Sequence, residues 1–227
     1  IVDFGTTTGS TFSTITGQVN GKIRLAADNF PSGDAGEFAD ASSGGTVEYY
    51  GTGYNLSTSR TFRNMVVNLT NTTNKLYLLS NYTLNGSLTI TRGEFYFGDN
   101  VSTTSRSLTV YGDFVVEANG KVHTGSANAR HQLNLYGDFT NRGNIQLTNR
   151  AAADYTAEAT DGIVDANFLS ATRNQSMLLY GPTRFYRIAI SKGLSSTYEL
   201  YMWASSSAYF ELFGYANEGH PDEKQLL

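Results

Sequence analysis

The sequence predicts an all-β protein, a right-handed parallel β-helix (solenoid) with turns of roughly 25 residues. Three observations predict it: apolar residues alternate with period two in short runs, helical periodicity is nearly absent, and a whole motif recurs at a fixed interval. An antiparallel β-sandwich is the alternative, because it also shows alternation with Gly and Asn turns. A sandwich does not require whole motifs to recur at a fixed interval.

The alternating runs are short, rich in Tyr, Phe, Thr and Val, and end at Gly or Asn. They include Leu84-x-Gly86-x-Leu88-x-Ile90, Phe95-x-Phe97, Leu108-x-Val110 and Leu133-x-Leu135. The best helical candidate, residues 151–159, has no apolar stripe at helical spacing. We therefore expect strands throughout.

The recurrent motif is Tyr111-Gly-Asp-Phe114, which returns as Tyr136-Gly-Asp-Phe139. Residues 82–97, 108–124 and 133–147 are expected to form successive parallel rungs, since a single turn cannot bury its apolar face alone. Two inward columns follow, one of Leu84, Val110 and Leu135 and the other of Leu88, Phe114 and Phe139. A third column, of Gly86, Gly112 and Gly137, should lie where the backbone bends, because glycine has no Cβ to clash there.

Residues 1–227 are predicted to form a single β-solenoid segment of a longer chain, with regular turns over 82–147. A looser repeat relates residues 47–68 to residues 177–191, so that Phe62 aligns with Phe185 and Asn64 with Arg187. The N-terminal stretch 1–20 and the stretch 210–214 are strand-like, and an apolar segment restarts at 225–227. We expect an interior section of a rod, because a solenoid end normally carries a cap.

Some of these repeats resemble those of giant secreted surface proteins of Bacteroidetes-type bacteria. The resemblance lies in Gly44-Gly-Thr-Val-Glu-Tyr-Tyr-Gly51, in Phe62-Arg-Asn-Met-Val-Val67 and in the Leu-x-Val/Leu-Tyr-Gly-Asp-Phe motif, and it covers roughly residues 30–215. Some proteins of that kind are adhesins used in gliding or attachment and exported by the type IX secretion system. The resemblance implies a β-helix-like form and a location on the cell surface.

Composition excludes several classes of function. With a net charge of −4 the chain as a whole does not attract a negatively charged phosphate backbone, so nucleic acid is not an expected partner. The absence of cysteine excludes disulfides, thiolate zinc sites and cysteine nucleophiles. No apolar run approaches the roughly 18 residues of a membrane helix, so we expect no transmembrane segment.

The motifs of catalysis are also missing, and we predict no catalytic, cofactor-binding or metal-binding residue and no enzyme activity. The three histidines, His123, His131 and His220, form no zinc-binding pattern. Neither a phosphate-binding glycine loop nor a Gly-x-Ser-x-Gly elbow occurs. His123 and His131 flank a polar segment that links one turn of the repeat to the next, and we expect both to be solvated loop residues.

Two groups of residues leave an alternative open. A pectate-lyase-like enzyme would use acidic residues and an arginine, and the candidates are Asp113, Asp138, Glu117 and Arg142. The simpler interpretation is that the aspartates cap turns. We expect water rather than a bridging Ca²⁺ around Asp113 and Asp138, because no third acidic ligand recurs in the repeats. Tyr111 and Tyr136 should face outward one above the other, either covering the sheet or stacking on sugars.

The sequence thus predicts a structural or adhesive rod segment of an extracellular bacterial cell-surface protein. Its expected partners are neighbouring segments of the same long polypeptide, with surface glycans or the secretion and anchoring machinery as further candidates. The alternative is a carbohydrate-binding module or a polysaccharide-active β-helix.

Overall fold

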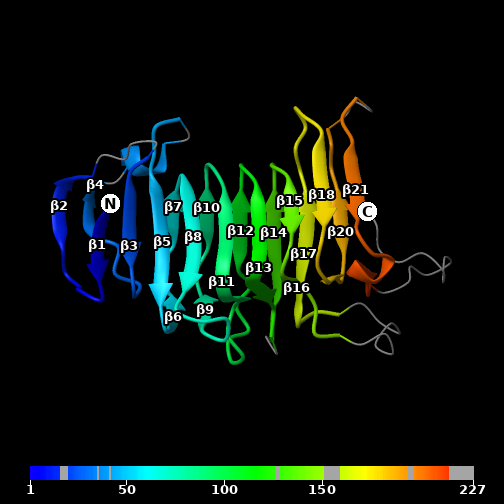
Figure 1. Cartoon of the computed structure of the whole chain (residues 1–227), viewed down its shortest axis with the longest axis horizontal. Coiled ribbons are helices and arrows are strands. Elements are labelled where there is room, and N and C mark those ends of the chain that lie inside the picture. Colours follow the sequence, from blue (N-terminus) through cyan, green and yellow to red (C-terminus); the bar gives the residue numbers. More distant parts are fainter. Residues whose placement is uncertain are drawn as a thin grey trace.

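The computed structural model describes residues 1–15, 20–34, 36–40, 42–125, 128–150, 159–193 and 197–214. These residues form an all-β fold of two large parallel sheets and one small one, whose strands lie side by side along the long axis of the molecule (Figure 1). The main path of the fourteen-stranded sheet is β1 (Val2–Gly5), β3 (Lys22–Leu25), β5 (Thr46–Gly51), β8 (Asn64–Leu69), β11 (Leu88–Phe97), β13 (Phe114–His123), β15 (Phe139–Asn141), β18 (Gln175–Leu179) and β21 (Leu200–Ala204). Its other strands are β6 (Gly53–Leu56), β9 (Lys75–Leu78), β16 (Asn144–Gln146), β19 (Thr183–Phe185) and β22 (Phe210–Leu212).

The second large sheet has six strands in the order β20 (Ile188–Ile190), β17 (Ile163–Phe168), β14 (Arg130–Leu135), β12 (Ser107–Val110), β10 (Tyr82–Leu84) and β7 (Arg60–Phe62). Strands β2 (Thr11–Thr14) and β4 (Ser32–Asp34) form the small sheet, and two short 3-10 turns, η1 (Gly36–Ala39) and η3 (Ser207–Tyr209), complete the described elements. Between the described strands every pairing is parallel, and the one antiparallel contact is an isolated bridge from Thr148 to Ile163. This is not the pairing of an antiparallel sandwich, and it is consistent with a parallel β-helix.

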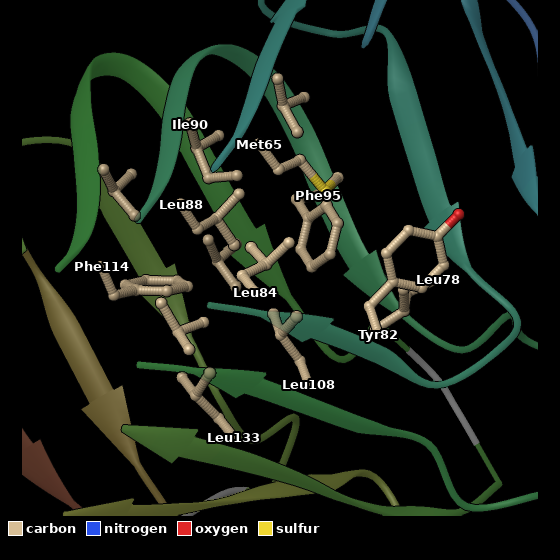
Figure 2. Packing of buried hydrophobic residues seen from close by; sticks show 14 of the residues in the cluster. Met65, Leu78, Tyr82, Leu84, Leu88, Ile90, Phe95, Leu108, Phe114 and Leu133 are labelled. Atoms are coloured by element: carbon tan, nitrogen blue, oxygen red, sulfur yellow. The ribbon is translucent and has the colours of Figure 1, made fainter. Parts of the chain in front are cut away.

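The predicted register over residues 82–147 is confirmed. Leu84 pairs with Val110 and Val110 with Leu135 in the six-stranded sheet, and all three side chains are fully buried. In the fourteen-stranded sheet the corresponding column is Leu88, Phe114 and Phe139. Side chains from both sheets point into one interior, among them Leu84 of the six-stranded sheet and Leu88 and Phe114 of the fourteen-stranded sheet (Figure 2).

The fourteen-stranded sheet is bent, so that its strands line two faces of the interior. The first half of β11 pairs with β8 and its second half with β9, with a shift of register between Ile90 and Arg92. Strand β13 repeats this division, pairing first with β15 and then with β16. Gly93 lies at the bend with φ of +102°, in the left-handed region that favours glycine.

The predicted glycine column is also confirmed at the other bend. A Cβ built on Gly112 would lie 2.6 Å from the carbonyl carbon of Gly86, and one built on Gly137 would overlap the carbonyl of Gly112. Successive rungs therefore approach each other there backbone to backbone. That approach leaves no space for any side chain.

Replacing Gly137 by alanine tests this close approach. Because the added methyl group would meet backbone atoms that cannot rotate away, we expect Gly137→Ala to destabilise the protein by about 1–3 kcal/mol. Chemical denaturation followed by circular dichroism measures the change. Gly36→Ala is the control, since its Cβ would meet only the exposed Asp34 carboxylate, at 3.3 Å. Equal stability of Gly137→Ala and the unmodified protein would contradict the stacking of Gly137 on Gly112.

Outside residues 82–147 the length of a turn varies. Thr46 pairs with Asn64, which makes that turn shorter than the regular ones, whereas Phe139 pairs with Met177 across a longer turn. Insertions and deletions at the corners take up such differences, because the rungs themselves stay in register. One apolar cluster nevertheless extends from Ile23 to Ile188.

The looser repeat corresponds to equivalent positions in the fold in its first half alone, where Val47 and Met177 lie in one column of the fourteen-stranded sheet. Its second half falls on different positions. Phe62 ends a strand of the six-stranded sheet and is followed by β8 of the fourteen-stranded sheet. Phe185 ends a strand of the fourteen-stranded sheet and is followed by β20 of the six-stranded sheet. The aligned residues share a pattern of apolar and polar positions at a corner, but the corners are different ones.

Some predictions concern residues that the structure does not describe. The helical candidate at 151–159 lies outside the described residues except for Ala159, and the segments around His220 and at 225–227 lie outside them entirely. The strand-like character predicted for 210–214 is confirmed by β22. At the other end, β1 and β2 confirm strands within the stretch 1–20.

Candidate functional site

The aspartates of the repeated motif act as caps between rungs. The backbone N–H of Asp138 donates to Oδ1 of Asp113 over 3.0 Å, and the N–H of Ser176 donates to Oδ1 of Asp138 over 2.7 Å. The same pattern continues on the N-terminal side, where Ser87 accepts from the N–H of Asp113 over 3.0 Å. These side chains form a ladder in which each one satisfies an N–H of the next rung. The sequence-based preference for capping is confirmed.

An arginine lies beside the two aspartates, at the place that a bridging cation would occupy. Arg173 places Nη2 3.4 Å from Asp113 Oδ1 and 3.8 Å from Asp138 Oδ1, so one guanidinium group offsets the repulsion between the two carboxylates. All three side chains are about half exposed, and such surface pairs contribute little to stability.

Removal of divalent ions should therefore leave the thermal stability of the protein unchanged. We expect the melting temperature in excess EDTA to equal that in Ca²⁺, because Arg173 already supplies the positive charge between Asp113 and Asp138. Thermal melting followed by circular dichroism gives the comparison. A marked fall in stability with the chelator would show that a metal ion is bound at this corner.

The four candidate residues of a lyase do not meet at one place. Glu117 and Arg142 form their own exposed ion pair, with 3.3 Å between Oε1 and Nη1. Asp113 and Glu117 stand at opposite ends of the first part of β13, about 13 Å apart at the usual rise of a strand. Asp113, Asp138, Glu117 and Arg142 thus form two separate surface groups. These four residues therefore do not place a base and a carboxylate around one sugar.

The prediction of solvated histidines is wrong for both described ones. His131 lies in β14 with no exposed surface, packs against Phe97 at 6.2 Å between ring centres, and accepts the N–H of Arg106 at Nδ1 over 3.0 Å. His123 is half-buried and stacks on Tyr96 at 5.1 Å. His131 occupies the same phase of β14 as the inward Leu133 and Leu135, which explains its burial.

Burial gives His131 a measurable effect on stability. Desolvation, with a smaller contribution from the positive charge of Arg106, lowers the pKa of His131 to about 4 in the folded protein. The unfolded chain binds this proton at about pH 6.5. The stability contributed by the neutral ring is therefore complete above about pH 6.5 and is lost as the pH falls towards 4, by about 3 kcal/mol in all.

We expect His131→Gln to remove most of this pH dependence between about pH 6.5 and 4.5. Glutamine keeps an acceptor near the Arg106 N–H but binds no proton, so its unfolding free energy should change little in that window. Urea denaturation at a series of pH values measures it. His123→Gln is the comparison. Burial lowers the pKa of His123 as well, but this ring is only half-buried. An unaltered slope in His131→Gln would refute the assignment.

Tyr111 and Tyr136 lie one above the other on the surface, as predicted. Their rings stack at 4.5 Å with an angle of 25° between planes, and Tyr111 is 48% exposed. Each ring uses one face for the other, so the arrangement is that of a cross-rung pair covering the sheet.

A polar groove that the sequence did not indicate runs along the outer face of the six-stranded sheet. It has a volume of about 540 Å³. Its floor is an axial column of polar residues, one from each rung, namely Asn81, Ser107, Gln132, Asp165 and Arg187. We call it the arginine groove, because Arg106 and Arg130 also line it.

The centre of the arginine groove is a buried carboxylate between two guanidinium groups. Arg130 holds Asp165 in a bidentate pair, with 2.7 Å from Nε to Oδ2 and 3.1 Å from Nη2 to Oδ1. Arg187 approaches the same carboxylate from the next rung, with 2.8 Å from Nη2 to Oδ2. The Asp165 side chain is only 2% exposed, whereas each arginine side chain is 24% exposed. The geometry fixes both arginines while their outer edges still reach water.

Two further features of the part of the chain that the structure describes bear on its chemistry, namely whether it holds a metal-binding cluster and whether it holds a membrane-spanning helix. No group of three or more histidine or acidic side chains there is arranged to hold a metal ion. Within those residues, no helix has the length and apolar character to cross a membrane. Comparison of the chain with protein-family models, with curated proteins and with solved structures finds no match. The fold defines a class, that of all-β proteins built from parallel sheets.

Proposed function

We propose that the chain is a rigid segment of a right-handed parallel β-helix, with regular turns of roughly 25 residues over 82–147, in an extracellular bacterial surface protein. It acts there as a spacer or adhesive rod and performs no catalysis. The observation that carries the proposal is the pairing of nine strands in one unbroken parallel path from β1 to β21. Such a stack extends about 40 Å at the usual distance between strands and is stiff, because each rung is hydrogen-bonded to the next.

Location and partners rest on the resemblance to repeats of secreted gliding and attachment adhesins. In that setting the partners are neighbouring segments of the same polypeptide, surface glycans, and the machinery of type IX secretion and anchoring. A surface rich in Thr, Asn and Ser, with 16% charged residues in the whole chain, suits an extracellular spacer.

Two measurements test this proposal. Small-angle X-ray scattering should give an elongated particle with the cross-section of a single β-helix, and a spherical envelope would contradict the rod. Antibodies against the segment should label intact cells of the source organism before permeabilisation. Labelling that needs permeabilisation would contradict the surface location.

A carbohydrate-binding or polysaccharide-active β-helix is the second candidate, and an exposed aromatic pair favours the binding form. Trp203 and Tyr180 are 41% and 44% exposed and lie 5.2 Å apart, with Arg142 5.7 Å above the Tyr180 ring. Aromatic side chains exposed in this way suit contact with sugar rings. A glycan array followed by a lyase assay on uronic-acid polymers separates the forms. Binding without turnover supports a binding module, and release of product supports an enzyme. If neither occurs, only the rod function remains.

A further inference from the structure

Several asparagines of the chain stand in the sequon Asn-x-Ser/Thr, in which x is not proline and a sugar can be attached to the asparagine amide. The sequon asparagines are Asn55, Asn68, Asn71, Asn81, Asn85, Asn100 and Asn174. The sequon alone is a weak signal, because asparagine, serine and threonine are all common in this chain. The fold distinguishes among them by the exposure and the contacts of each one.

Strand alternation buries the middle residue of four of these sequons. Where the asparagine faces outward in or beside a strand, the residue that follows it faces the core. The buried middle residues are at most 1% exposed, and they are Leu56, Leu69, Tyr82 and Gln175. A transferase cannot enclose such a segment without pulling it out of its rung, so these four sequons are poor acceptors in the folded protein.

The remaining three sequons differ in how freely they are exposed. Asn85 is held by the atom that would react, because its Nδ2 donates to the carbonyl oxygen of Ala39 over 2.7 Å. Asn100 is exposed, but Ser102, the hydroxyl residue of its sequon, is only partly exposed. In the sequon of residues 71–73 all three residues are exposed. That sequon is therefore the one most open to an enzyme.

A tight turn fixes the amide of Asn71 at the corner between β8 and β9. Its Oδ1 accepts the N–H of Thr73 over 3.1 Å, the hydroxyl of Thr73 over 2.9 Å and the N–H of Asn74 over 3.0 Å. In return, the N–H of Asn71 donates to Oδ1 of Asn74 over 3.1 Å. These bonds make an Asx turn that holds the side chain of Asn71 in one orientation.

The same contacts favour reaction at the nitrogen of this amide. Nδ2 of Asn71 forms no hydrogen bond with any described residue, so both of its N–H groups are open to an enzyme. Three donors on Oδ1 stabilise the negative charge that the amide acquires when Nδ2 loses a proton. One of the three is the hydroxyl of Thr73, the group that the sequon requires two positions after the asparagine.

We propose that Asn71 is a glycosylation site, modified by a glycosyltransferase that uses a sugar activated as a phosphate ester. Nδ2 of Asn71 forms a bond to C1 of the sugar, and the bond from C1 to the phosphate oxygen breaks. The phosphate leaves with the electron pair of that bond, and a basic group of the transferase accepts the proton from Nδ2. Nothing is oxidised or reduced.

The site goes beyond the proposed rod function and does not depend on it. A protein that is a rod by scattering and labels on intact cells, but carries no sugar, would refute the glycosylation site alone.

Peptide mass spectrometry of the full chain, purified from the source organism, tests the site. Trypsin releases residues 64–75, which contain the sequons of both Asn68 and Asn71, so one peptide holds the site and its internal control. We expect this peptide to carry the mass of a sugar, and electron-transfer fragmentation to place that mass on Asn71. An unmodified peptide, or a sugar on Asn68 in its place, would overturn the proposal.

The mass of the sugar also identifies the class of donor. A single hexose indicates transfer from a nucleoside diphosphate sugar. An oligosaccharide of defined composition indicates transfer of a preassembled chain from a lipid-linked pyrophosphate. Both results support the site, because both donors present C1 of the sugar bonded to a phosphate oxygen.

Three variants produced in the same organism then test the role of the turn. Thr73→Val replaces the hydroxyl by a methyl group and should lower the occupancy of Asn71 at least about tenfold. Thr73→Ser keeps a hydroxyl and should keep the sugar. Thr70→Val removes the sequon of Asn68, and as the matched control it should change the occupancy of Asn71 by less than about twofold.

All three substitutions lie at exposed positions, so each variant should melt like the unmodified protein. Unchanged occupancy in Thr73→Val, or an equal loss in Thr73→Val and Thr70→Val, would contradict the assignment to Asn71.

Discussion

Val110→Asp should unfold the protein or bring it close to unfolding. Val110 has no exposed surface and lies between Leu84 and Leu135 in consecutive rungs, so a carboxylate there has neither water nor a partner. We expect a loss of about 3–5 kcal/mol, comparable to that of leaving a buried charge unpaired. This is a large fraction of the roughly 5–15 kcal/mol that stabilises a typical domain.

The matched control is Thr109→Asp, one residue away in the same strand. Thr109 faces outward, where its Oγ1 accepts from Asn134 over 3.3 Å, and an aspartate can accept the same bond. Its unfolding free energy should change by no more than about 0.5 kcal/mol. Urea denaturation of both variants gives the comparison. If Val110→Asp melted like the unmodified protein, the inward column would be wrong.

The regular part of the fold was predictable because one motif marks the register. Tyr-Gly-Asp-Phe combines a bend, a cap and an inward aromatic ring, and its return one turn later places Phe139 on Phe114 without any further information. Outside that region, the unequal lengths of the turns remove the periodicity, although the rungs remain paired.

His131 was open to prediction from the alternation alone. It stands two and four positions before Leu133 and Leu135, a spacing that places all three side chains on the inward face. The expectation of a solvated residue gave more weight to the polarity of histidine than to its phase in the strand. Phase is the stronger guide here, since a shift of register by a single position would expose both leucines.

Asp165 was not open to prediction in the same way. Alternation places it on the outer face of β17, between the inward Val164 and Ala166, where an aspartate would be expected in water. It is buried because Arg130 and Arg187 close over it from positions 35 residues before it and 22 after it. Neither interval matches the period of the repeated motif, so the cluster that forms the centre of the arginine groove becomes visible only in three dimensions.

The ring of Phe139 contacts aromatic rings of both large sheets. Its ring stacks on Phe114 at 5.4 Å with 5° between planes, and it also contacts Phe168 at 6.1 Å and Phe185 at 5.9 Å. Phe168 belongs to the six-stranded sheet and the other two belong to the fourteen-stranded sheet. The ring therefore joins consecutive rungs along the axis and also joins opposite faces across the interior.

Phe139→Ala should cost about 3–5 kcal/mol, because it removes a fully buried ring and leaves a cavity that the rigid rungs cannot close. Tyr111→Ala is the control: it also loses one stacked ring, but from the surface, and should cost about 0.2–1 kcal/mol. Urea denaturation measures both. Benzene gives a second readout, since a dry apolar cavity binds it, and it should raise the melting temperature of Phe139→Ala alone. Equal losses in the two variants, with no effect of benzene, would mean that Phe139 does not fill the shared core.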